Sequence, residues 1–203
     1  MQSDDHLHPR RSGLENIPWL YDLAMSLVER GRFRRWRQWL VGGARGRVLE
    51  IGCGTGRNLP LYPAGVRVTA VDPWPQNVAA ARRRSPRALL VQARAEALPF
   101  AAAAFDTTVA SLVLCSVEDP ARALSEIRRV LAPGGSVRAI EHVRARSRWL
   151  SRLQDAVQPA WTWVTGGCHP NRDTESLVAA AGLRISEDGR RARGLLRRFA
   201  ASR

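Results

Sequence analysis

A glycine-rich turn that directly follows a short apolar run is the feature that most constrains this chain. In VLEIGCGTGRN, residues 48–58, glycines occupy the alternate positions 52, 54 and 56. A backbone without Cβ atoms can approach a ligand closely, and in doubly wound sheets such a turn follows the first strand at the ligand-binding edge. Asp72 ends the next predicted strand, where a carboxylate can hold ribose hydroxyls. The turn and this acid predict an open α/β sheet with a ligand at the carboxyl ends of its strands.

The rest of the chain alternates between strand and helix patterns. We expect strands at 47–51, 66–72, 88–93, 105–114 and 136–143, helices at 15–29, 31–42, 75–85, 120–132 and 172–181, and a hairpin of strands 183–188 and 194–200 that turns around Gly189. A segment with several tryptophans, 148–166, interrupts the alternation. This order predicts an α/β, Rossmann-like sheet of seven mostly parallel strands with helices on both faces. We expect one domain over 15–203, with a helical lid at 15–42 and a disordered tail at 1–14.

Composition excludes several classes of protein. The chain has 203 residues, 45% of them hydrophobic, which is typical of one globular domain. The net charge of +14 comes entirely from arginine, scattered through the helices, so we expect no nucleic-acid partner. A polar N-terminus and the lack of a long apolar run predict a cytoplasmic protein without a membrane anchor. Three separated cysteines without a C-x-x-C pair predict neither a disulfide framework nor a metal site.

Residues around the glycine turn discriminate between two cofactor classes. A dinucleotide fingerprint would place glycine at position 57, which is Arg57 here. The acid Glu50, just before the first glycines, would repel a pyrophosphate but suits the ammonium group of S-adenosylmethionine (SAM). The segments RAEALPF (94–100) and LAPGGSV (131–137) complete the pattern. Together these residues resemble the class I SAM-dependent methyltransferase family.

That resemblance implies a fold, a reaction and a set of cofactor contacts. It implies the class I methyltransferase fold and methyl transfer from SAM, which leaves S-adenosylhomocysteine. The implied contacts are, from the methionine part through ribose and adenine to the sulfonium, Glu50, Gly52, Cys53, Gly54, Thr55, Gly56, Asn58, Asp72, Pro73, Ala95, Glu96, Ser111 and Leu112, with Tyr21 covering the cofactor. Arg94 replaces an Asp of the family pattern G-D-A-E-x-L-P-F and cannot accept a hydrogen bond from adenine, so it is not among these contacts.

A narrower resemblance concerns the methyl acceptor. The stretches LVLCSVEDP (112–120), RRVLAPGGSVRAIEHV (128–143) and VQPAWTWVTGGCHPNRDT (157–174) look like those of the alkyl thiol methyltransferases. The resemblance implies a small, fairly apolar thiol as acceptor, in secondary metabolism or in thiol detoxification. A thiolate is a strong nucleophile, so a general base helps without being obligatory. His142, at the carboxyl end of the fifth strand, is the candidate base.

Other residues and other acceptors stay open at this stage. Candidates for the acceptor site are Cys115, Trp149, Trp161 and His169, although core packing explains the tryptophans equally well. A phenol, a quinone-ring carbon or a phospholipid amine could take the methyl group instead. An RNA methyltransferase and a SAM-binding protein without catalysis are the remaining alternatives. The oligomeric state is not predicted.

Overall fold

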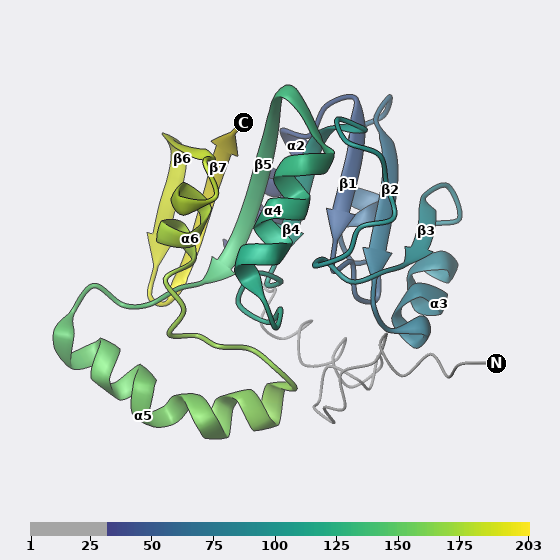
Figure 1. Cartoon of the computed structure of the whole chain (residues 1–203). Coiled ribbons are helices and arrows are strands. Elements are labelled where there is room, and N and C mark those ends of the chain that lie inside the picture. Colours follow the sequence, from purple (N-terminus) through teal and green to yellow (C-terminus); the bar gives the residue numbers. More distant parts are fainter. Residues whose placement is uncertain (1–31) are drawn as a thin grey trace.

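A computed structural model describes residues 32–203 (Figure 1). Tyr21, the helix expected at 15–29 and most of the expected lid lie outside these residues. The elements are α2 (Arg32–Gly42), β1 (Arg47–Ile51), the short 3₁₀ helix η2 (Leu59–Leu61), β2 (Arg67–Asp72), α3 (Pro75–Arg84), β3 (Leu89–Gln92), β4 (Phe105–Ser111), α4 (Pro120–Val130), β5 (Leu131–His142), α5 (Arg148–Thr165), α6 (Thr174–Ala180), β6 (Arg184–Arg193) and β7 (Leu196–Ser202). The predicted alternation of strands and helices is confirmed.

The strands form one seven-stranded sheet in the order β3-β2-β1-β4-β5-β7-β6. β1 pairs in parallel with both β2 and β4, whereas β7 runs antiparallel to β5 and to β6. The chain builds outward from β1 to β3 and then returns to place β4 on the other side of β1. The carboxyl ends of β1 and β4 therefore flank the switch point, where open α/β sheets bind their ligands.

Helices cover both faces of the sheet because side chains of β1 alternate between the faces. Leu49 and Ile51 are buried in one cluster with Leu124 of α4, and α6 packs on the same face. Val48 is buried in a second cluster with Leu40 of α2. Figure 1 shows α4 in front of the strands and α2 behind them. The helix α2, expected as part of a lid, is packed on the sheet at this second face.

The closing hairpin turns at a different glycine from the one predicted. Its turn lies between Arg193 and Leu196, at Gly194 (φ +56°), and not around Gly189. Gly189 lies within β6 with φ +73°, where the pairing with β7 shifts register. A Cβ at Gly189 would lie 3.0 Å from the Trp39 ring. In a strand pattern, a glycine is compatible with either a turn or a bulge. Gly189 lies at a bulge, where the Trp39 ring is close to its backbone.

The fourth strand is also shorter than predicted. β4 ends at Ser111, and Leu112 has φ +61°, a left-handed conformation that is rare for a residue with a branched side chain. The apolar residues 112–115 therefore form a turn at the edge of the sheet and not the end of a strand. Backbone strain of this kind persists only where the surroundings fix it.

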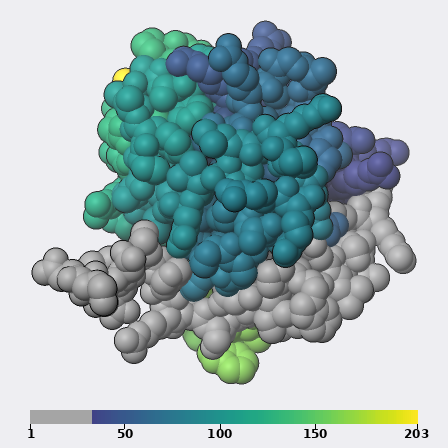
Figure 2. Space-filling model, turned by 90° about the vertical axis from the view of Figure 1, so that its right-hand side faces the viewer, coloured from purple at the N-terminus to yellow at the C-terminus, as the bar shows by residue number. Residues whose placement is uncertain are grey.

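The tryptophan-containing segment forms α5, which lies below the edge at which the parallel strands end (Figure 1). The burial of its side chains is the reverse of the usual pattern. The polar Ser151 and Gln154 are buried, whereas Trp149 and Trp163 are 72% and 77% exposed. Seen from the side of β3, α5 protrudes at the bottom of the molecule (Figure 2). Within residues 32–203, α5 and the other helices lack the combination of length and apolar composition needed to cross a bilayer.

Candidate functional site

A cavity of about 170 Å³ opens at the switch point. Its walls come from the residues that follow β1, β2, β3 and β4, and from the end of α5. Predicted cofactor contacts on these walls are Gly52, Gly54, Thr55, Asp72, Pro73, Ala95, Glu96, Ser111 and Leu112. The other predicted contacts among the described residues do not line the cavity; they are Glu50, Cys53, Gly56 and Asn58.

The three glycines of the turn have different surroundings. All have positive φ, which favours glycine. A Cβ at Gly54 would meet nothing within 4 Å, whereas a Cβ at Gly56 would lie 2.9 Å from the Cα of Ala81 in α3. Gly54 therefore leaves room for a ligand, and Gly56 lets α3 pack closely against the turn.

Asp72 connects the ends of β1 and β2. Its Oδ2 accepts a hydrogen bond from the backbone N–H of Gly54 at 2.8 Å. Its Oδ1 accepts from the N–H of Trp74 at 3.0 Å and from the Asn77 side chain at 3.1 Å. Burial raises the pKa of the Asp72 carboxyl, and these three donors oppose the shift. The carboxylate is thus held rigidly on the cavity wall.

Glu50 is a fully buried acid beneath the turn. Its Oε1 accepts a 2.8 Å hydrogen bond from the Asn58 amide, which in turn accepts one from Arg37 of α2 at 2.7 Å. Burial raises the pKa of Glu50 to about 7, although Asn58, Tyr62 and Arg37 lower it in part. Its second oxygen, Oε2, has no hydrogen-bond partner among the described residues. The buried Tyr62 hydroxyl acts on the same carboxyl, so Glu50 belongs to a polar group behind the cavity wall.

The wall formed after β3 carries charged residues with partners of their own. Glu96 Oε1 accepts from the backbone N–H of Glu118 at 3.0 Å. Arg94 donates to Glu118 Oε2 at 2.8 Å. Arg94 lines the cavity although it was not among the predicted contacts. Arg94 was left out of the prediction because an arginine cannot accept the adenine hydrogen bond that the family's Asp accepts at this position.

Glu141 holds the turn that follows β4. This fully buried carboxylate accepts hydrogen bonds from the backbone N–H groups of Val113, Leu114 and Cys115, at 3.0, 3.0 and 3.1 Å. The bonds fix the left-handed conformation of Leu112 at the cavity wall. Glu141 was not among the predicted site residues, although a single acid in an otherwise apolar strand is a signal for such a role.

Three predicted acceptor-site elements converge beside this turn. His142 Nδ1, at the end of β5, lies 3.9 Å from Cys115 Sγ and 3.4 Å from the Sγ of Cys168, which follows α5. The His142 ring also meets the Trp161 ring edge-on, with centroids 6.3 Å apart. Interaction with Cys115 and then with His142 lowers the pKa of the Cys168 thiol to about 4, against the effect of burial.

The remaining acceptor-site candidates occupy different positions. His169 donates its backbone N–H to the carbonyl of Cys115 at 2.7 Å, so it lies next to this group. Trp149 lies at the other end of α5 from Trp161, roughly 18 Å away for a regular helix. The structure does not bring Trp149 to the other candidates.

Several cavity residues were missed by the sequence analysis. They are Ile51, Trp74, Asn77, Ala93, Arg94, Val113, Ser116, Val117, Glu118 and Gly166. Trp74 and Asn77 follow Asp72 closely and could have been inferred from it. Arg94 and Glu118 are charged residues paired with each other. The others are small or apolar residues whose types carry no signal of their own.

The cavity fits SAM on three observations. Gly54 leaves open space where a side chain would stand. Asp72 presents a fixed carboxylate at the end of β2. On the cavity wall, the buried Ser111 Oγ has no hydrogen-bond partner within residues 32–203. A ligand with hydroxyl and ammonium donors can bond to Asp72 and Ser111.

Residues 49–158 match the family model of the methyltransferase domain. The chain belongs to this family, with the class I fold, and its cofactor is SAM. It is similar to the thiol S-methyltransferase TMT1A of Homo sapiens, with 34% identity over 170 residues that cover 80% of this chain and 70% of that protein. A second human thiol S-methyltransferase, TMT1B, is matched over only 58% of its length.

Two further proteins are similar to this chain. The phosphatidylethanolamine N-methyltransferase of Cereibacter sphaeroides is 33% identical over 174 residues, which cover 83% of this chain and 84% of that protein. The crystal structure of a SAM-dependent methyltransferase from Thermotoga maritima superposes with a TM-score of 0.70 at 23% identity, covering 93% of this chain and 98% of the other. The latter likeness supports the fold alone.

Proposed function

We propose that this protein transfers the methyl group of SAM to the sulfur of a small, fairly apolar thiol. The observation that carries the proposal is the 34% identity to a thiol S-methyltransferase across 80% of the chain. That stretch of similarity is long enough to include both the cofactor cavity and the acceptor side.

The chemistry of the acceptor side supports the proposal. Methyl transfer is an in-line displacement, so the protein mainly aligns the nucleophile with the methyl group. Acceptors of high pKa need a strong base, but a thiol does not. The carboxylates of Glu141, Glu96 and Glu118 at this edge are each occupied by backbone or arginine donors. In the absence of a bound metal, His142 is the proposed proton acceptor for the incoming thiol.

An acceptor panel tests the proposal. Purified protein and SAM are incubated with an alkyl thiol, an aryl thiol, a dithiol, a quinol and vesicles of phosphatidylethanolamine, and products are identified by mass. We expect thioethers and S-adenosylhomocysteine from the thiols. Methylation of the quinol or of the lipid amine, with the thiols untouched, would refute a thiol acceptor.

Two tryptophan variants form a matched pair for the same assay. Trp161 contacts the His142 ring, whereas Trp149 is exposed at the far end of α5. We expect Trp161→Ala to lower kcat/KM for the thiol by about tenfold, since the acceptor side loses one wall, and Trp149→Ala to leave it unchanged. Equal losses in both variants would contradict the placement of the acceptor beside His142.

A further inference from the structure

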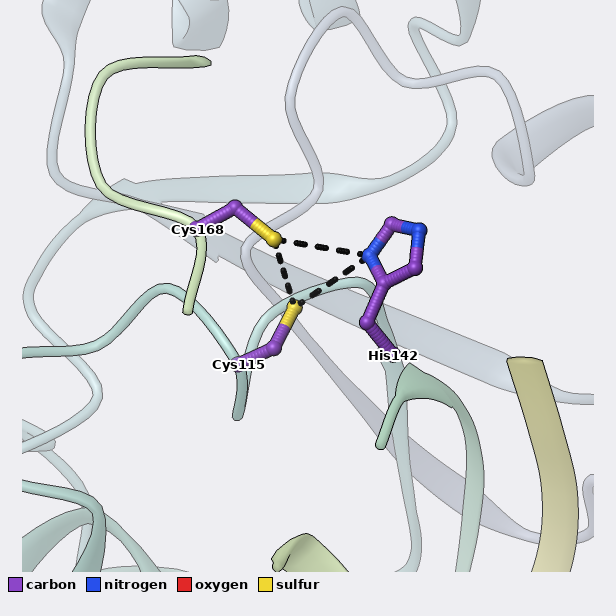
Figure 3. Close-up of side chains that lie close together, drawn as sticks. All are labelled: Cys115, His142 and Cys168. Atoms are coloured by element: carbon purple, nitrogen blue, oxygen red, sulfur yellow. Dashed lines mark hydrogen bonds between the residues drawn. The ribbon is translucent and has the colours of Figure 1, made fainter. Parts of the chain in front are cut away.

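Two sulfurs and one imidazole nitrogen meet in a closed triangle at the carboxyl edge of the sheet (Figure 3). Cys115 follows β4, His142 ends β5, and Cys168 lies beyond α5. The Sγ atoms are 3.6 Å apart, and His142 Nδ1 lies 3.4 Å from Cys168 Sγ and 3.9 Å from Cys115 Sγ. Figure 3 shows the other ring nitrogen pointing away from both sulfurs.

The triangle has the dimensions of a zinc site. Tetrahedral Zn²⁺, with Zn–S of about 2.3 Å and Zn–N of about 2.0 Å, separates two sulfurs by roughly 3.8 Å and a sulfur from a nitrogen by roughly 3.5 Å. The observed separations differ from these by a few tenths of an ångström. Three groups linked in a row by hydrogen bonds need only two short distances between their atoms. A metal ion bound by all three groups requires three short distances, and all three are found here.

Hydrogen bonds to the backbone of Cys115 and Cys168 position these two candidate metal ligands without a metal ion. Glu141 accepts from the Cys115 N–H, and the Cys115 carbonyl accepts from the His169 N–H at 2.7 Å. The Thr162 hydroxyl of α5 donates to the Cys168 carbonyl at 2.9 Å. Both cysteines are buried. Fixed ligand orientation of this kind is typical of built metal sites.

The donor set favours zinc with an open position. Two thiolates and a neutral imidazole balance the charge of Zn²⁺, and soft sulfur ligands select zinc over magnesium or calcium. Three protein ligands leave the fourth tetrahedral position to an exogenous ligand, as in catalytic zinc sites. Ser116 and Gly166, close in sequence to Cys115 and Cys168, line the cofactor cavity. The three donors therefore lie next to the cofactor cavity, and the proposal below puts the open position on that side.

We propose that Cys115, His142 and Cys168 bind a zinc ion whose fourth ligand is the thiolate of the methyl acceptor. The identity of that fourth ligand rests on the proposed function, whereas the metal site itself does not. An incoming thiol displaces bound water, gives its proton to solvent and coordinates as thiolate. Its sulfur lone pair then forms the bond to the methyl carbon while the methyl–sulfonium bond breaks, and the oxidation state of zinc does not change. His142 is then a ligand and not the proton acceptor.

Metal content tests the site directly. The protein is purified without chelators, and its zinc is measured by inductively coupled plasma mass spectrometry. We expect about one zinc per chain in the native protein and in Cys53→Ser, which alters the buried cysteine of the glycine turn. Cys115→Ser and Cys168→Ser should lose most of the zinc. Stoichiometric zinc in both of these variants, or none in the native protein, would overturn the proposal.

Cobalt substitution tests the open position without relying on variants that could misfold. The native protein is stripped of zinc and reloaded with Co²⁺, whose thiolate charge-transfer and d–d bands report tetrahedral sulfur ligation. Addition of ethanethiol without SAM should intensify the charge-transfer band. An unchanged spectrum would overturn thiolate as the fourth ligand.

The two proposals fail separately. Thiol methylation by zinc-free protein, unaffected by 1,10-phenanthroline, would overturn the role of zinc in binding the acceptor and leave the proposed function intact. Zinc and cobalt binding through Cys115 and Cys168 without any methylated thiol would uphold the metal site and overturn the proposed function.

Discussion

Asp72 Oδ2 accepts a 2.8 Å hydrogen bond from the backbone N–H of Gly54, and this bond ties the end of β2 to the glycine turn after β1. Both residues line the cofactor cavity. The bond orients a carboxylate oxygen and sets the shape of the turn at the same time. Changes at either residue should therefore act on cofactor binding more than on the rest of the fold.

Replacing Asp72 by asparagine should weaken SAM binding. Asp72→Asn removes the charge and places an amide N–H₂ against one of the N–H donors, so we expect the dissociation constant to rise by about ten- to hundredfold. Isothermal titration calorimetry measures it. Asp106→Asn is the control, because Asp106 forms an exposed ion pair with Arg47 at the opposite edge. Equal losses of affinity in both variants would contradict the role of Asp72.

Alanine at Gly54 should mainly lower the affinity for SAM, whereas alanine at Gly56 should mainly lower the free energy of unfolding. Gly54→Ala adds a methyl group to open cavity space, so we expect a clear loss of SAM affinity and about 1 kcal/mol of strain from the left-handed backbone. Gly56→Ala drives a Cβ to 2.9 Å from Ala81, so the free energy of unfolding should fall by about 2–4 kcal/mol. Urea denaturation and calorimetric titration separate the two effects. Similar stability losses in both variants would refute the distinction.

Glu50 should make the cofactor-free protein less stable as pH rises. Its folded pKa of about 7 exceeds the ordinary 4.5, so the folded state binds the proton more tightly. The stability contribution of Glu50 is therefore lost between pH 4.5 and pH 7, by up to about 3 kcal/mol. Burial dominates the shift, Asp72 adds to it, and Asn58, Tyr62 and Arg37 oppose it.

The variant Glu50→Gln isolates this effect. Without SAM, we expect the variant to be more stable than the native protein at pH 8 and nearly equal to it at pH 4.5, by urea denaturation at both pH values. A stability difference that does not change with pH would contradict the burial of an ionising acid at this position.

Glu141 should be needed for the turn after β4. Glu141→Gln replaces an accepting oxygen by a donor that faces backbone N–H groups, so we expect unfolding free energy to fall by about 2 kcal/mol or more. The control Glu187→Gln alters an 80% exposed side chain paired with Arg190 and should cost less than about 0.5 kcal/mol. An unchanged free energy of unfolding in Glu141→Gln would mean that the turn is stable without these hydrogen bonds.

The sequence predicts most of the fold because local signals agree with the final packing. Asp119 and Pro120 mark the start of α4, and the Asp119 side chain does accept from the Arg122 N–H at 2.9 Å. The misplaced hairpin shows the limit of such signals. Two glycines five residues apart both fit a turn, and only the pairing of β6 with β7 and the position of Trp39 assign them to a bulge and a turn.

The site is predictable on its cofactor side and much less so on its acceptor side. The spacing of the alternating glycines and Asp72 is enough by itself to indicate a cofactor site. Cys115, His142 and Cys168 come from three separate elements, with no spacing that relates them. Their convergence depends on the order of β4 and β5 in the sheet and on the return of the chain after α5. A sequence without a C-x-x-C pair therefore predicted no metal site, although the folded chain brings three metal-binding side chains together.

The central claim is best tested by comparing acceptors that differ in one atom. The measurement is kcat/KM with SAM for an alkyl thiol, the corresponding alcohol and the corresponding primary amine, each corrected for the uncatalysed reaction. The account predicts that the thiol exceeds both analogues by at least about a hundredfold, which is about 2.7 kcal/mol in transition-state stabilisation. A preference for the amine or the alcohol would contradict it.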